Sequence, residues 1–176
     1  MSRPTVRSLL SRALRAIDRV APPRTVHAHC DIPCGIYDPH LMQIGALTVI
    51  RMNQLMDALE APAAGDKAAA LKHANSLSRY ITVKEEHAEL VKREVRIIFG
   101  DYFKPEHTEK FPELGQLAWD ILKAAGAAKQ GVGADGANAL LEKTQRFAEI
   151  FWESKGVATK KQPSNQAVGG EIVVPA

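Results

Sequence analysis

One short stretch of the sequence holds two cysteines and a histidine, and these side chains are the best suited to do chemistry. Their order is His29, Cys30 and Cys34. Pro33 and Gly35 prevent a regular helix at this point, so the segment is expected to form a hook that can wrap one ion. Thiolates are strongly donating ligands, and together with backbone nitrogens they suit a square-planar metal such as Ni(II) or Cu(II). The spacing therefore favours a metal hook.

Three other interpretations of the same donors stay open. A closed zinc site needs four ligands, and the missing one would have to come from a distant histidine, namely His73, His87 or His107. A disulfide between Cys30 and Cys34 is geometrically possible, although so small a loop gains little from chain entropy. A thiol redox pair usually has two residues between its cysteines and precedes a helix, whereas three residues separate them here.

The charge is distributed unevenly along the chain. Residues 1–28 contain six arginines against the single acidic residue Asp18, and residues 29–176 contain 17 basic and 19 acidic side chains. The basic isoelectric point of the chain therefore comes from the first 28 residues. Apolar side chains recur there at helical spacing, which predicts an amphipathic leader helix. The remainder of the chain gives no reason to expect a nucleic-acid partner.

The leader lacks the continuous apolar core of a secretory signal and has no twin-arginine pair. No apolar run approaches the roughly 18–20 residues that a membrane span needs. We therefore expect a cytoplasmic protein, while the Arg-rich composition leaves organelle targeting open. The residues "VHA" just before His29 provide a small-residue cleavage context.

Apolar residues recur at helical spacing through most of the remaining chain, and no strand pattern competes with them. The second expected helix has Asp66 as its N-cap, and its inward stripe includes Leu77 and Ile81. The fold class is therefore predicted to be all-α, an antiparallel up-and-down four-helix bundle. The four helices are expected to start at Pro39, to run from Asp66 to Ile98, to follow Pro112, and to run from Ala134 to Lys155.

The stretch "HCDIPCGIYDP", residues 29–39, resembles the metal hook of the nickel superoxide dismutase family, whose pattern is H-C-x-x-P-C-G-x-Y-x-P. Three further segments resemble family segments in the same order. They read "VKEEHAEL" at 83–90, "DYFKPEHTEKFPEL" at 101–114 and "IFWESK" at 150–155. The resemblance therefore covers about residues 29–156.

This resemblance implies a metal site that is completed by proteolysis. A precursor would be cut before His29, which frees the α-amine of that residue. The amine, the amide nitrogen of Cys30 and the thiolates of Cys30 and Cys34 would form a plane around one nickel ion per subunit. The His29 imidazole would bind axially when the nickel is oxidised. The implied domains are a leader at 1–28, the hook at 29–39 and the bundle at 40–156, and residues 157–176 read as a flexible tail.

The implied activity is an antioxidant one, in which superoxide is converted to dioxygen and hydrogen peroxide by Ni(II)/Ni(III) cycling. Tyr37 would order water or relay a proton, Tyr102 would neighbour it, and Lys104 would supply positive potential for the anion. The implied partners are a processing peptidase and further copies of the chain in a homohexamer. A carrier module that binds nickel or copper without turnover, and a helical thiol-redox protein, are the alternative functions.

Two departures from the family pattern concern the axial histidine. Well-known members place a glutamate and an arginine behind it, and the aligned residues here are Gly45 and His87. We expect His87 to take over the orientation of the His29 ring, directly or through water. The chain also carries an extension of about a dozen residues around 61–76, which would lengthen the second helix or alter subunit contacts.

Overall fold

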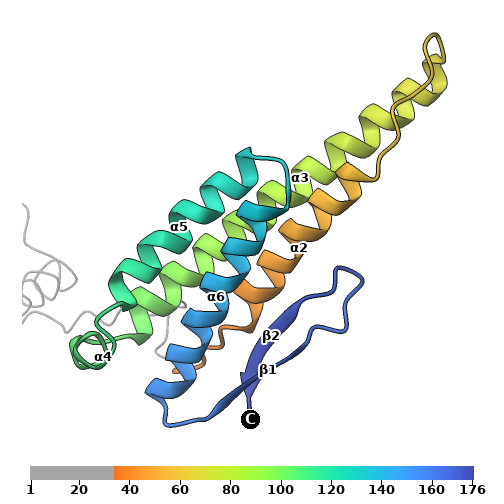
Figure 1. Cartoon of the computed structure of the whole chain (residues 1–176). Coiled ribbons are helices and arrows are strands. Elements are labelled where there is room, and N and C mark those ends of the chain that lie inside the picture. Colours follow the sequence, from red (N-terminus) through yellow and green to blue (C-terminus); the bar gives the residue numbers. More distant parts are fainter. Residues whose placement is uncertain (1–33) are drawn as a thin grey trace, which may run out of the picture. The chain divides into compact units, whose positions relative to one another are not determined.

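The computed structural model describes residues 34–176, so His29, Cys30 and the leader lie outside the described residues. Six helical segments and one β-hairpin follow one another in this part of the chain (Figure 1). Within the described residues, no helix is long and apolar enough to cross a membrane. The elements are α2 (His40–Asp57), α3 (Lys67–Ile97), the π-helical η1 (Ile98–Tyr102), α4 (Pro105–Lys110), α5 (Leu114–Gln130), α6 (Ala134–Ser154), β1 (Thr159–Pro163) and β2 (Glu171–Pro175).

The four long helices α2, α3, α5 and α6 provide the core. Helix α2 packs against α3 and α6, and α5 packs against the same two helices. Each helix turns an apolar stripe inward, because removing these side chains from water is the main stabilising term. The apolar stripe of the fourth expected helix, from Ala134 to Lys155, is confirmed, since its members are fully buried. They are Leu140, Thr144, Phe147 and Phe151.

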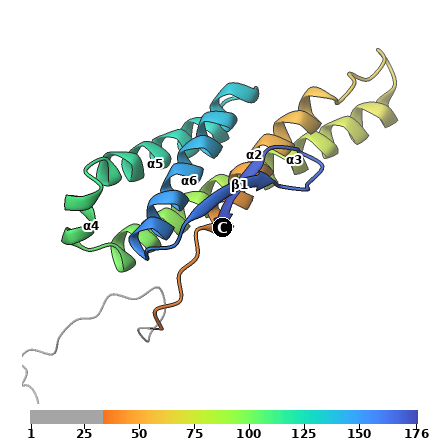
Figure 2. The same ribbon diagram turned by 60° about the horizontal axis from the view of Figure 1, so that its bottom comes forward.

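The start of α3 follows the expected capping chemistry. The Asp66 carboxylate accepts a hydrogen bond from the backbone N–H of Ala69 at 2.9 Å, as an N-cap side chain should. The prediction that Ile81 faces inward is wrong, because that side chain is 41% exposed. Figures 1 and 2 show the reason, since the first half of α3 and the end of α2 project beyond α5 and α6. Among residues 34–176, no third helix covers the outer face of this projecting arm.

Residues 101–113, which lie between the second and third expected helices, are mostly helical. It contains the end of η1 and the short helix α4, and it places Phe103 and Phe111 in the core. The hydrogen bonds of this π-helical turn span five residues, one more than in an α-helix, so the turn at the end of α3 is wider. Such turns are often found at functional sites. Tyr102 is the last residue of this turn.

The prediction of a flexible tail at residues 157–176 is wrong, and with it the expectation of an all-α fold. Strands β1 and β2 pair antiparallel, with Lys161 opposite Val173. Ile172 and Val173 are buried against the helical core, so the segment is held by tertiary contacts that no local periodicity could reveal. The description as mostly helical is confirmed, with this two-stranded hairpin added to it.

Two buried glutamines attach the hairpin to the helices. The side-chain amide of Gln43 on α2 bonds to both backbone groups of Val173, accepting from its N–H at 2.7 Å and donating to its carbonyl at 3.0 Å. The amide of Gln145 on α6 donates to the carbonyl of Glu171 at 2.7 Å. These amides bond to backbone groups of β2 that do not pair with β1. They therefore satisfy backbone groups that would otherwise be buried without partners.

A buried lysine holds the loop between α5 and α6. The Lys84 ammonium is 2% exposed and donates to the carbonyl of Gly131, the residue that follows α5, at 2.7 Å. A cation at the C-terminal end of a helix is favoured by the helix dipole. Burial nevertheless lowers the pKa of Lys84 below its ordinary value, a shift that nearby Glu85 partly opposes.

Candidate metal centre

The segment in front of α2 carries the one expected metal donor among the described residues. Cys34 is half-buried and is followed by Gly35, which adopts a φ of +69°. This left-handed conformation is open to glycine at little cost and strains most other residues. The glycine of the hook motif therefore has a structural reason, because it turns the backbone directly after the cysteine.

Local hydrogen bonds shape the same segment. The backbone N–H of Ile36 points at the sulfur of Cys34, with a donor-to-sulfur distance of 3.4 Å. An N–H directed at a cysteine sulfur stabilises the thiolate form and tunes a metal bound to it. Asp38 accepts a bond from the N–H of His40 at 2.7 Å, which fixes the entry into α2. Figure 2 shows that the chain in front of α2 is extended and belongs to no helix or β-strand.

Aromatic rings gather where this segment meets the end of α3. The ring centroid of Tyr37 lies 5.6 Å from that of Tyr102, and Tyr102 packs against Phe151 of α6 at 4.7 Å. The structure thus brings together two of the expected site residues, one before the start of α2 and one after the end of α3, at the same end of the helical body. Tilted pairs at such distances add to the stabilisation from burial.

Lysines contribute unequally to this cluster. Lys104 is exposed, whereas the Lys155 ammonium lies over the rings of Tyr102 and Phe151, at 5.3 Å and 4.6 Å from their centroids. A cation held over aromatic faces is attracted by their quadrupoles and keeps its charge at a defined place. Lys155 was missed as a site residue, although it closes the "IFWESK" segment of the resemblance and could have been found there.

His107 completes the cluster from α4. Its ring stacks on Tyr102 with centroids 5.6 Å apart and an interplanar angle of 12°. Its Nδ1 accepts the backbone N–H of Lys104 at 3.0 Å, so the neutral ring must carry its proton on Nε2. His107 therefore serves as a cap for α4 and as a wall of the aromatic cluster.

The structure gives a reason for the departure at Gly45. A Cβ at this position would lie 2.9 Å from the side chain of Val91 and 3.2 Å from the backbone oxygen of His87. Any side chain at 45 would force α2 and α3 apart, so a glutamate does not fit this packing. Nδ1 of His87 donates to the carbonyl of Val83 at 2.8 Å, so Nδ1 carries the proton of the neutral ring. Only Nε2 of His87 is available to a further partner.

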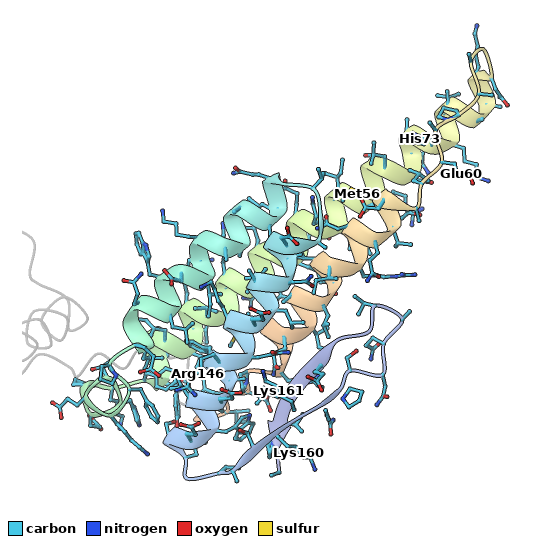
Figure 3. The ribbon with its side chains drawn as sticks, in the orientation of Figure 1. Met56, Glu60, His73, Arg146, Lys160 and Lys161 are labelled. Carbon is cyan, nitrogen blue, oxygen red and sulfur yellow. The ribbon has the colours of Figure 1, made fainter. Side chains whose placement is uncertain are left out.

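The geometry weakens the zinc interpretation for one of its histidines. His73 lies on the projecting arm beside Glu60 (Figure 3), where both line a pocket at the far end of α2. Cys34 precedes the opposite end of that 18-residue helix, and such a helix is about 27 Å long. No group of three or more metal-ligating side chains occurs within residues 34–176.

A group of ion pairs centred on Arg146 lies on the surface of the helical body. Arg146 of α6 (Figure 3) bonds to Glu113 at 2.7 Å and to Glu149 at 3.2 Å. The bond from Arg146 lowers the pKa of Glu113. The pairs are largely exposed, so we assign them only a small stabilising effect.

Comparisons with known proteins identify relatives. A family model described as nickel-containing superoxide dismutase matches residues 24–155. The superoxide dismutase [Ni] of Streptomyces coelicolor is 40% identical over 135 residues, which is 77% of this chain and 94% of the relative. The corresponding protein of Streptomyces seoulensis is 36% identical with the same coverage.

Solved structures agree with these relatives. A native nickel superoxide dismutase structure is 38% identical and matches with a TM-score of 0.62, covering 72% of this chain and 99% of its own. A nickel-containing superoxide dismutase whose nickel ligation corresponds to the oxidised state is 34% identical and has a TM-score of 0.63, with coverage of 73% and 99%.

Proposed function

This chain belongs to the nickel-containing superoxide dismutase family, and from that membership we infer that it is an oxidoreductase that uses nickel to dismutate superoxide. The observation that carries this conclusion is the family match across residues 24–155, which includes the whole hook motif. The carrier alternative is not favoured, because the relatives are named as enzymes.

The proposed ligands are the thiolates of Cys30 and Cys34, the amide nitrogen of Cys30, and the amine and imidazole of His29. Cys34 fits this set, since a glycine turn and an N–H bond to its sulfur fix the position of that sulfur directly before α2. When bound, nickel supplies the one-electron chemistry that alternately oxidises and reduces superoxide. Thiolate and amide ligands are strongly donating, which suits a metal that must cycle between two oxidation states.

We propose that the protein residues around the site manage water, protons and charge. Tyr37 orders water or relays a proton at the hook, and Tyr102 lies beside it with a centroid distance of 5.6 Å. Lys104 and Lys155 attract the superoxide anion, and the fixed position of Lys155 over Tyr102 makes it the stronger contributor.

The fold that we propose is the antiparallel up-and-down four-helix bundle of α2, α3, α5 and α6, preceded by the hook. Each of these helices packs mainly against two neighbours, which supports the arrangement of such a bundle. We further propose a homohexamer in the cytoplasm, with one nickel ion per subunit. Size-exclusion chromatography with light scattering measures the number of subunits.

Maturation is proposed to occur by cleavage of the Ala28–His29 bond by a processing peptidase. In the uncut chain the nitrogen of His29 is an amide, which is not a basic ligand. In the cut chain it is a free amine that can bind the metal. The residues 1–28 would therefore keep the precursor inactive.

A direct test expresses the chain from His29 onward, loads it with nickel and measures superoxide removal together with metal content. We expect one nickel per subunit, turnover, and the electron spin resonance signal of oxidised nickel. The uncut chain, treated identically, is the matched control and should be inactive. Activity in the uncut chain would refute the amine ligand, and bound nickel without turnover would favour the carrier.

We also propose that His87 orients the imidazole of His29 through its Nε2, directly or through water. The free Nε2 supports this idea, because Nδ1 is engaged by Val83. The His87→Ala variant should lower activity and alter the spin resonance spectrum of the oxidised site. An unchanged rate and spectrum would show that His87 is only a helix-surface residue.

A further inference from the structure

The last turn of α6 contains a hydroxyl group that bonds in two directions. The Oγ of Ser154 lies 2.7 Å from the carbonyl oxygen of Phe151 and 2.7 Å from the hydroxyl oxygen of Tyr102. A serine hydroxyl has one proton, so it can donate to only one of these partners. The phenol of Tyr102 can both donate and accept. The direction of one bond therefore decides the direction of the other.

The carbonyl of Phe151 decides the direction. It belongs to the last turn of a helix, where carbonyls lack partners within the helix. The N–H of Lys155, which would reach Phe151 in a longer helix, instead donates to Trp152 at 3.0 Å. Phe151 is fully buried, and a buried carbonyl without a donor costs roughly 1–3 kcal/mol. Ser154 therefore donates to Phe151, and Tyr102 must donate to Ser154.

We propose that Ser154 is a positioning residue that takes the hydroxyl proton of Tyr102. Towards every other partner, Tyr102 then acts only as a hydrogen-bond acceptor. It can hold a water molecule that donates one of its protons to Tyr102 and presents the other to a bound anion. Tyr102 itself does not donate to superoxide or peroxide. The proposal rests on the proposed function, because it takes the hook beside Tyr37 to be the reaction site.

The surroundings of Tyr102 keep this arrangement in place. Its ring is stacked on His107, packed on Phe151 and covered by the ammonium of Lys155. A ring enclosed in this way has little freedom to swing its hydroxyl to another partner. The bond to Ser154 spans 52 positions of the sequence and joins the end of η1 to the end of α6. Its direction is therefore a property of the tertiary fold.

Raman spectroscopy tests the bond direction without nickel. The ring doublet of tyrosine changes its intensity ratio according to whether the phenol donates or accepts a hydrogen bond. Subtracting the spectrum of Tyr102→Phe from that of the full chain isolates Tyr102 from the other tyrosines. Because Tyr102 donates to Ser154 and can also accept from water, we expect a ratio below that of a phenol that only accepts. Ser154→Ala should change this ratio, and Ser154→Thr should retain it. A phenol that only accepts in the unaltered chain would overturn the proposal.

The same variants in the nickel-loaded chain that starts at His29 test the consequence for the reaction. We expect Ser154→Ala to lower kcat/KM by about ten-fold, which is the lower end of what the loss of an outer partner of a metal site usually costs. We also expect the pH profile of kcat/KM to change. Ser154→Thr should restore both. An unchanged pH profile in Ser154→Ala would refute the positioning role. If the unaltered nickel-loaded chain shows no turnover, the proposed function fails, whereas the Raman result on bond direction still stands.

Discussion

The segment in front of α2 and the hairpin after α6 are both short and non-helical, yet they are held in different ways. The first segment contains Cys34 and the 75% exposed Ile36, and hydrogen bonds that span two residues shape it. The hairpin buries Ile172 and Val173, and its bond between Gln43 and Val173 spans 130 residues. The hydrogen bonds described for the first segment are local and it makes a long-range contact through the ring of Tyr37 against Tyr102, whereas the hairpin is held to the helices by buried side chains and by bonds of long range.

The difference separates chemistry from stability. The segment with Cys34 lies inside the residues that the family model matches, whereas the hairpin lies beyond residue 155, where that match ends. A metal-binding turn needs donors at fixed spacing and some freedom to close on its ion. A hairpin without such donors contributes through buried area and hydrogen bonds. We therefore expect changes in the two regions to affect different measurements.

The largest effect is expected at Cys34. Replacing it by serine in the nickel-loaded chain that starts at His29 removes a thiolate ligand, so nickel content and superoxide removal should fall by more than about 100-fold. The free energy of unfolding of the metal-free chain should change by less than about 0.5 kcal/mol, since the side chain is only half-buried. Metal analysis, a superoxide assay and urea denaturation measure these quantities. A large loss of stability would mean that the segment is part of the core.

Removal of the hairpin should produce the opposite result. A chain that ends at Gly156 exposes the faces of α2 and α6 that Ile172 and Val173 cover. We expect the free energy of unfolding to fall by about 3–5 kcal/mol, from the lost apolar burial and glutamine bonds less the entropy of ordering the strands. Most of the activity of the nickel-loaded protein should remain at low temperature. Loss of activity in a folded, truncated chain would show that the hairpin belongs to the site.

The two glutamines on α2 provide a matched pair for a smaller effect. Gln43→Leu removes both bonds to Val173 and should lower the free energy of unfolding by about 1–2 kcal/mol, less than truncation because a detached hairpin can bond to water. Gln54→Leu removes two exposed bonds, one donated to Val168, which lines a cavity of about 260 Å³, and one accepted from Arg51. It should cost less than about 0.5 kcal/mol. Equal losses in urea denaturation would contradict the importance of the buried pair.

The smallest effect is a pH dependence that involves neither region. Because the pKa of Lys84 is lowered in the folded chain, the unfolded chain binds more protons between that lowered pKa and the ordinary value near 10.5. The free energy of unfolding should therefore gain a contribution as the pH rises through this window. Comparison with Lys84→Met at several alkaline pH values isolates it, and Lys72→Met on the exposed arm is the control. A difference that does not vary with pH would refute the assignment.

Much of the helical body was predictable from the sequence. The periodic stripes, the Asp66 cap and the break before Ala134 are local signals, so helix identity followed from them. The stripe of α3 failed at Ile81 because periodicity shows which residues share a face but not whether another helix covers that face. The hairpin was missed because "TKKQP" and "EIVVP" are too short to show alternation, and their anchors Gln43 and Gln145 lie on distant helices.

The candidate site shows the same division. The motif from His29 to Pro39 named the donors, Gly35 and Tyr37 without any structure, because a metal site at a chain turn depends on residue types at fixed local spacing. Lys155 and Ser154 were not singled out, because their roles arise only where the end of α6 meets Tyr102. The replacement at Gly45 was visible in the sequence, but its reason was not.

The sequence by itself therefore determined the family and the four long helices, and it predicted the metal donors, since each of these depends on neighbouring residues. The tertiary structure alone decided that Gly45 permits α2 to approach α3, that the last strands are ordered, and that Ser154 receives the proton of Tyr102. Each of these depends on atoms from distant parts of the chain meeting at van der Waals or hydrogen-bond distance, and only the folded packing fixes such distances.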